Sequence, residues 1–341
     1  MAIAVRSFAK INIGLCIGAR RPDGFHELRT VYQTIALHDT VRVDVQRGTG
    51  IEIRVKDPRV PADESNTCWR VAERVMKALM ARGKVVIAID KQLPVQGGVG
   101  AASSNAVATM LALQRVLKAE LPPEERLRIA AEVGSDLPLF LLGGTVLGTG
   151  RGEQVFPLEE PETLYAVVAT PAVGVSTPQA FKDWDEQFGR EMIAAAGAEQ
   201  PLTGKLTQPC ESDRISRFSQ SIFAWLTGSW RQKVAASGVP AVRGGDRAET
   251  PLLDLVRAGI ENDFERVVFP KYPELREVKR LLEREGARYA SLSGSGSALY
   301  GLFEDPRQTE KAAASLRGSG VLALVTTTLN RQEYWRQMFC E

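Results

Sequence analysis

The sequence has few of the residues that build metal sites and disulfide frameworks. It contains two histidines among 341 residues, and its four cysteines (Cys16, Cys68, Cys210 and Cys340) are widely spaced, with no CxxC pair. A structural zinc site needs clustered Cys or His ligands, so we do not expect one. Scattered thiols are typical of a protein kept in a reducing compartment rather than cross-linked.

Charge of one sign and long apolar runs are also lacking. The 43 Lys and Arg residues nearly balance the 41 Asp and Glu residues. The net charge of +2 gives no electrostatic reason to bind nucleic acid or a membrane surface. Two uncharged stretches, 92–114 and 163–181, approach membrane-spanning length, but glycines interrupt the first and prolines the second. Arg6 and Lys10 break up the apolar run that a signal peptide would need, so we expect a soluble cytoplasmic protein.

The composition and length indicate a globular protein of two domains. Hydrophobic residues make up 44% and charged residues 25%, and 341 residues correspond to about two domains at roughly 150 residues each. Charged residues and Pro161 interrupt the pattern near 159–162, so we predict an N-terminal domain over 1–160 and a C-terminal domain over 161–341. Residues 189–250 show weak periodicity. We predict an insert there, with one docked helix over about 219–230, remote from the functional site.

Alternating apolar residues predict strands in both halves. Every second residue from Ile11 to Ile17 is apolar, which predicts a strand with one buried face and places Lys10 and Asn12 on the opposite face. Near the C-terminus, two strand patterns flank residues 293–297 and are followed by a helix and another strand. This order favours a split βαβ arrangement.

Two glycine-rich loops are the strongest local signals. Residues 97–104 (GGVGAASS) follow a β-branched run and precede an Ala-rich helical segment. Glycines allow close approach of the backbone to phosphate, and the N–H groups of a helix N-terminus attract it. Neither GxxxxGK[ST] nor GxGxxG is present, so a plain tight turn remains an alternative. Residues 293–297 (SGSGS) are either a flexible hairpin or a second clamp on the same phosphate.

Four side chains are candidates for chemistry, and each has a structural alternative. Lys10 is either an edge-strand lysine that limits aggregation or a cation beside a hydroxyl or phosphate. Asp136 follows the helix-ending Gly134 and is either a helix N-cap or a general base. His26 and Tyr32 are either a surface histidine and a core tyrosine or ligand contacts.

Four motifs together resemble one enzyme family. Residues 9–15 (AKINIGL) and 20–28 (RRPDGFHEL) resemble the N-terminal signature of the 4-diphosphocytidyl-2-C-methyl-D-erythritol kinases, a family of the GHMP kinase superfamily. Residues 93–105, 134–140 and 293–297 resemble the superfamily's phosphate loop, aspartate segment and third motif. The resemblance covers about 7–188 and 251–329, and the order of four motifs is more specific than any one of them.

This resemblance implies an α+β fold in two domains, an S5-like αβ domain followed by a ferredoxin-like domain, with the site between them. It implies an enzyme that uses ATP and Mg²⁺ to phosphorylate the 2-hydroxyl of a diphosphocytidyl methylerythritol in non-mevalonate isoprenoid synthesis. The implied partners are this small molecule and ATP, without nucleic acid or membrane, in a monomer or a homodimer.

The resemblance also implies roles for individual residues. Lys10 and Asp136 match the catalytic pair: Asp136 would accept or orient the hydroxyl proton, and Lys10 would lower the pKa of that hydroxyl and hold Asp136 in its charged form. The substrate contacts would be Asn12, His26, Tyr32 and Thr177, with Tyr32 stacked on the cytosine and His26 bonded to its edge. The ATP contacts would be Pro94, Val95, Gln96, Gly97, Gly98, Val99, Gly100, Ala101, Ala102, Ser103 and Ser104, and Ser104 is the candidate contact to magnesium.

Some positions depart from the family pattern. Val99, Ala101 and Ala102 replace residues that are usually Leu, Gly and Gly or Ser, and Phe25 stands where tyrosine is common. Two alternatives stay open: another GHMP kinase of the homoserine or mevalonate type, or a nucleotide-binding protein without turnover. The RRPDGFHEL segment argues against the first, and the presence of both Lys10 and Asp136 argues against the second.

Overall fold

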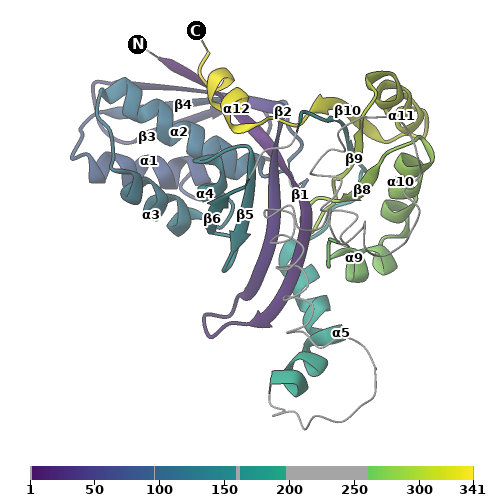
Figure 1. Cartoon of the computed structure of the whole chain (residues 1–341). Helices are drawn as coiled ribbons and strands as arrows, with labels where there is room; N and C mark the ends of the chain where they lie inside the picture. The colour runs from purple at the N-terminus through teal and green to yellow at the C-terminus, as the bar shows by residue number, and fades with distance from the viewer. Residues whose placement is uncertain (1, 96, 159–161, 197–259, 341) are drawn as a thin grey trace.

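The computed structural model describes residues 2–95, 97–158, 162–196 and 260–340, and the side chains of all of these except 190–196. Its strands form two sheets, and the long strands β1 (Ile3–Arg20) and β2 (His26–Gln46) run between the two halves (Figure 1). Among the described helices, none is both long enough and apolar enough to span a bilayer.

The first half contains a six-stranded sheet with the order β3-β4-β2-β5-β6, and β1 pairs with β2. Besides β1 and β2, its strands are β3 (Ile51–Val55), β4 (Lys84–Asp90), β5 (Thr145–Thr149) and β6 (Gln154–Pro157). The β3–β4 pair is parallel, and the other pairs are antiparallel.

Four helices pack beside this sheet, and local signals in the sequence define their ends (Figure 1). They are α1 (Thr67–Ala78), α2 (Ala101–Leu117), α3 (Pro123–Val133) and α4 (Leu137–Phe140). Asn66 caps α1 by accepting a hydrogen bond from the backbone N–H of Cys68, as its amide oxygen can at an N-cap. Proline opens α3, and the helix stops before Gly134, which the sequence predicted as a helix end.

The second half is a ferredoxin-like unit. Its strands are β7 (Tyr165–Thr170), β8 (Tyr289–Leu292), β9 (Leu299–Phe303) and β10 (Leu322–Thr327), all antiparallel in the order β10-β7-β9-β8. Its helices are α5 (Thr177–Ala196), α9 (Glu265–Lys271), α10 (Pro273–Arg284) and α11 (Pro306–Gly318). The strand–helix–strand–strand–helix–strand order is that of the split βαβ arrangement, which confirms the predicted α+β fold class.

The first strand differs from its prediction in being covered on both sides. Ile11 and Ile13 are fully buried in a core that includes Val168 and Tyr300 of the second half. On the opposite face Lys10 is also buried, at 3% exposure. The strand was expected to have one buried face, and it has two because the second half of the chain packs against it.

The last helix, α12 (Arg331–Met338), was not predicted from the sequence. It returns to the first half, where it lies near the N-terminus (Figure 1). Tyr334 and Met338 are buried in the core of the first half, and the Tyr334 hydroxyl donates to the carbonyl oxygen of Phe140 at 2.7 Å.

Parts of the sequence predictions lie outside the described residues. Residues 197–259 carry the helix predicted over 219–230, and residues 159–161 carry the predicted domain boundary. Helix α5 continues to Ala196, into the stretch 189–250 where the sequence predicted an insert. The division into domains over 1–160 and 161–341 stays a prediction.

Candidate active site

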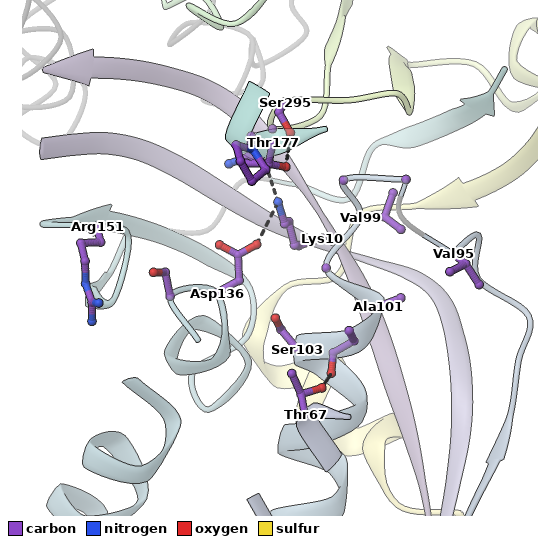
Figure 2. Close-up of a pocket in the computed structure, with 18 of the residues that line it drawn as sticks. Lys10, Thr67, Val95, Val99, Ala101, Ser103, Asp136, Arg151, Thr177 and Ser295 are labelled. Carbon is purple, nitrogen blue, oxygen red and sulfur yellow. Dashed lines mark hydrogen bonds and ion pairs between the residues drawn. The ribbon is translucent and has the colours of Figure 1, made fainter. Parts of the chain in front are cut away.

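A cavity of about 950 Å³ lies where strands of the first half meet loops from both halves. Its lining includes residues of β1, β2, the loop after β4, the start of α2, the segment before α4, the start of α5, and the loop 293–297. In Figure 2 Lys10 and Asp136 point toward one another, Thr177 and Ser295 lie together beyond Lys10, and Ala101 and Ser103 mark the start of α2. The size is within the range of small-molecule sites in enzymes.

Lys10 and Asp136 form an ion pair in the lining of the cavity. The Nζ atom of Lys10 lies 3.3 Å from Oδ2 of Asp136 and donates a hydrogen bond to Oδ1 of Asn12 at 2.7 Å. Asn12 in turn donates to the hydroxyl of Thr30 at 2.8 Å. Asp136 directly precedes α4, but its side chain makes no capping hydrogen bond, so the geometry does not support the N-cap alternative.

Tyr32 supports this pair and is not placed as a stacking surface. Its hydroxyl donates to Oδ1 of Asp136 at 3.1 Å, and the residue is 2% exposed within the core of the first half. Burial and the neighbouring Asp136 carboxylate raise the pKa of Tyr32 well above its usual range, so the phenol keeps its proton and remains a donor. The predicted stacking of Tyr32 on a base therefore has no support in this geometry.

The first glycine-rich loop runs directly into helix α2. Gly98 and Gly100 have φ values of 74° and 72°, which favour glycine, and the carbonyl oxygen of Val99 accepts a hydrogen bond from the backbone N–H of Lys10 at 2.9 Å. Ala101 and Ala102 are the first two helical residues, where alanine fits without strain. The unpaired N–H groups of this helix start are a suitable place for phosphate oxygens.

The second loop packs against the first. The Ser293 hydroxyl donates to the carbonyl oxygen of Gly98 at 3.1 Å, and the backbone N–H of Ala298 donates to the carbonyl oxygen of Gly97 at 3.1 Å. A Cβ atom on Gly98 would lie 2.3 Å from the carbonyl oxygen of Ser293, so no larger residue fits there without moving the loops apart. Asn262 holds the second loop by donating to the carbonyl oxygens of Leu292 and Gly294, each at 2.8 Å.

Most of the predicted ligand contacts line this cavity. Ser104 is 2% exposed and is not a lining residue, whereas Ser103 is. Gln96 lies outside the described residues. The predicted residues that line the cavity are Lys10, Asn12, His26, Tyr32, Pro94, Val95, Gly97, Gly98, Val99, Gly100, Ala101, Ala102, Ser103, Asp136 and Thr177.

One end of the cavity is aromatic, and sequence reasoning found only part of it. The ring of His26 stacks on Phe181 with centroids 4.9 Å apart and an angle of 7°, and its Nε2 atom lies 2.7 Å from Oδ1 of Asp185. Phe25 is 51% exposed at this end, with the Arg151 guanidinium 4.9 Å from its ring centre. The spacing of four residues from Thr177 to Phe181, which puts both on one face of a helix, was the signal that could have found Phe181.

Comparison with known proteins agrees with this geometry. The GHMP kinases N terminal domain matches residues 66–144, and the GHMP kinases C terminal domain matches residues 248–322. The 4-diphosphocytidyl-2-C-methyl-D-erythritol kinase of Solibacter usitatus is 35% identical over 340 residues, which are 99% of this chain and 93% of that protein. The chain belongs to this kinase family. The corresponding kinase of Rhodococcus jostii is 33% identical and covers 95% of the chain and 91% of that protein.

Solved structures agree on the fold. A crystal structure of 4-(cytidine 5'-diphospho)-2C-methyl-D-erythritol kinase superposes with a TM-score of 0.66 at 29% identity and covers 95% of this chain and 98% of that one. A homoserine kinase from Cytophaga hutchinsonii gives a TM-score of 0.68 at 19% identity, covering 98% of this chain and 96% of its own, and shows the shared fold alone. As a GHMP kinase, the chain is a small-molecule phosphotransferase with ATP as its cosubstrate.

Proposed function

We propose that this cavity transfers the γ-phosphoryl group of ATP to the 2-hydroxyl of 4-diphosphocytidyl-2-C-methyl-D-erythritol. The choice of this substrate is based on the name of the kinase family to which the chain belongs. The observation that carries the site is the Asp136 carboxylate, which Lys10 and Tyr32 hold from two sides in the cavity that the glycine-rich loop also lines.

Each group has a role that follows from its surroundings. The loop 97–104 and the first turn of α2 hold the ATP phosphates through backbone N–H groups. Asp136 accepts the hydroxyl proton as that oxygen attacks the γ-phosphorus atom. The Lys10 ammonium group stabilises the negative charge that develops on the attacking oxygen. Phosphoryl transfer needs mainly such positioning and charge neutralisation.

The residues present fit a magnesium ion held largely by phosphate. No group of three or more His, Cys, Asp or Glu side chains suited to a metal occurs among the described residues. Mg²⁺ usually takes one or two protein oxygens together with substrate phosphates and waters. Asp136 and Ser103 line the cavity and would supply such oxygens. When bound there, the ion would neutralise phosphate charge. We assign the magnesium contact to Ser103 rather than to Ser104, because of these two residues only Ser103 lines the cavity.

The aromatic end is suited to the cytidine group. His26 and Phe181 present stacked rings there, and Phe25 exposes another. Aromatic rings bind nucleobases by stacking. Asn12 and Thr177 also line the cavity and would contact the rest of the substrate.

The test is turnover by the purified chain with ATP, Mg²⁺ and three alcohols in parallel. We expect ADP release with 4-diphosphocytidyl-2-C-methyl-D-erythritol and at most background release with homoserine or mevalonate. Phosphorus NMR of the product should show a new phosphomonoester. Faster turnover of either other alcohol would contradict the proposal, and ATP binding without turnover of any of them would favour a binding protein.

A further inference from the structure

A buried carboxylate outside the cavity joins the two ends of the phosphate loop. Asp39, on β2, is 0% exposed. Its oxygens accept hydrogen bonds from Lys91 Nζ at 2.5 Å, from the backbone N–H groups of Gln92 and Leu93 at 2.7 Å each, and from Asn105 Nδ2 at 3.0 Å. Four donors match the roughly four acceptor positions of a carboxylate.

The four donors lie at the two limits of residues 93–105, the segment that contains the glycine-rich loop 97–104. Lys91, Gln92 and Leu93 directly follow β4, and Asn105 stands in the first part of α2, directly after Ser104. The amide oxygen of Asn105 also accepts a hydrogen bond from the Ser7 hydroxyl on β1. One carboxylate therefore fixes where the loop begins and where its helix starts, and links both to the strand that carries Lys10.

We infer that Asp39 is a positioning residue for ATP binding, which sets the direction of the loop N–H groups without contacting the nucleotide. This inference rests on the proposed role of residues 97–104 as the phosphate loop. A loop that is already ordered before ATP binds loses little conformational entropy on binding. Such preorganisation raises the affinity for ATP. A merely structural role would lower stability but leave the affinity for ATP relative to the other substrate unchanged.

The test uses Asp39→Asn in the full chain. One carboxylate oxygen accepts from the N–H groups of Gln92 and Leu93, and the other accepts from Lys91 and Asn105. The NH₂ group of the substituted amide replaces one of these two acceptors, so the variant cannot keep all four hydrogen bonds. We expect the Kd and KM for ATP to rise at least about tenfold, while the KM for the diphosphocytidyl substrate stays within about twofold. Hydrogen exchange at the amides of residues 97–104 should also become faster, because the loop is less ordered.

Asp183→Asn is the matched control. This carboxylate is 9% exposed on α5 and accepts hydrogen bonds from Lys271 at 2.5 Å and from Gln179 at 2.9 Å, and it does not line the cavity. We expect a lower melting temperature with an unchanged KM for ATP. An Asp39→Asn protein with unchanged ATP affinity and loop exchange, or with both KM values raised equally, would overturn the inference.

A milder variant decides the question if Asp39→Asn does not fold. Ser7→Ala removes the hydroxyl that fixes Asn105, and Ser7 does not line the cavity. We expect about a threefold rise in the Kd for ATP and no change for the other substrate, and an unchanged Kd would then overturn the inference. Turnover by the unsubstituted chain tests the proposed function separately, because it does not depend on how these variants bind ATP.

Discussion

The two ends of the cavity are built in different ways. At the charged end, Lys10, Asp136 and Tyr32 are joined by an ion pair and a hydrogen bond, and Lys10 and Tyr32 belong to two long paired strands. At the aromatic end, Phe25 belongs to the turn between β1 and β2 and is half exposed, and Phe181 belongs to α5. The charged end is fixed by directional contacts. The aromatic end offers ring surfaces, and one of them, the His26 ring, contacts the Asp185 carboxylate.

This difference separates two effects on the reaction. Groups held in one geometry and aimed at a reacting atom act mainly in the transition state, so their loss lowers kcat. Ring surfaces that bind a distant part of the substrate act before the reaction as well as during it, so their loss raises KM. The following substitutions test whether the two ends divide in this way.

The largest effect is expected at Asp136. Asp136→Asn removes the group that accepts the proton and keeps the shape of the side chain, so kcat should fall at least about a hundredfold. The Kd values for ATP and for the diphosphocytidyl substrate, measured by calorimetry, should change by less than about threefold. Normal turnover by this variant would leave Asp136 without a chemical role.

A smaller effect, confined to ATP, is expected at Gly98. Valine at φ 74° is strained, and its Cβ atom would meet the carbonyl oxygen of Ser293 at 2.3 Å, so Gly98→Val should separate the two glycine-rich loops. We expect the Kd for ATP to rise by about thirtyfold. Gly174→Val is the control, because a Cβ atom there meets nothing within 4 Å. Equal effects of the two substitutions would mean that the loop contact does not matter for ATP.

At the aromatic end the chain offers a matched pair of phenylalanines. Phe25 and Phe156 are each 51% exposed, but only Phe25 lines the cavity. Stacking on a base contributes about 1–3 kcal/mol. Phe25→Ala should therefore raise the KM for the diphosphocytidyl substrate by about tenfold at constant kcat, and Phe156→Ala should not change it. A fall in kcat without a change in KM for Phe25→Ala would contradict the division between the two ends.

The smallest effect is expected at Tyr32. Tyr32→Phe removes one hydrogen bond to Asp136, a carboxylate whose side chain is 32% exposed and which Lys10 still holds. A loss of about 1 kcal/mol, or roughly fivefold in kcat, is the expected size. The KM for the diphosphocytidyl substrate should not change, and a rise in KM at constant kcat would restore the stacking role that the sequence suggested.

The sequence predicted what local patterns and motif order determine. The strand around Lys10, the helix after the glycine-rich loop and the position of Asp136 before a short apolar helix all follow from neighbouring residues. The choice between Ser103 and Ser104 could not be predicted in this way. Adjacent helical residues face directions about 100° apart, and neighbouring residues do not determine which of the two faces the cavity.

Contacts between residues far apart in the sequence could not be predicted from local patterns. Asp39 lies 66 positions before Asn105, and nothing near Asp39 indicates that its carboxylate will be buried against a loop. Tyr32 was assigned to a base from the family resemblance, whereas its hydroxyl meets Asp136, 104 positions later. Pairings of this kind depend on how the sheets assemble, which alternating patterns do not specify.

The return of α12 has a consequence for synthesis on the ribosome. Leu329, Tyr334 and Met338 complete the core of the first half, Phe339 pairs with Val5, and the Arg115 guanidinium lies 3.3 Å from the centre of the Phe339 ring. A nascent chain that has emerged only as far as residue 158 therefore lacks part of its own interior. The first half therefore completes its core only after residues 329–339 have been translated, and a chain truncated before them has an incomplete core.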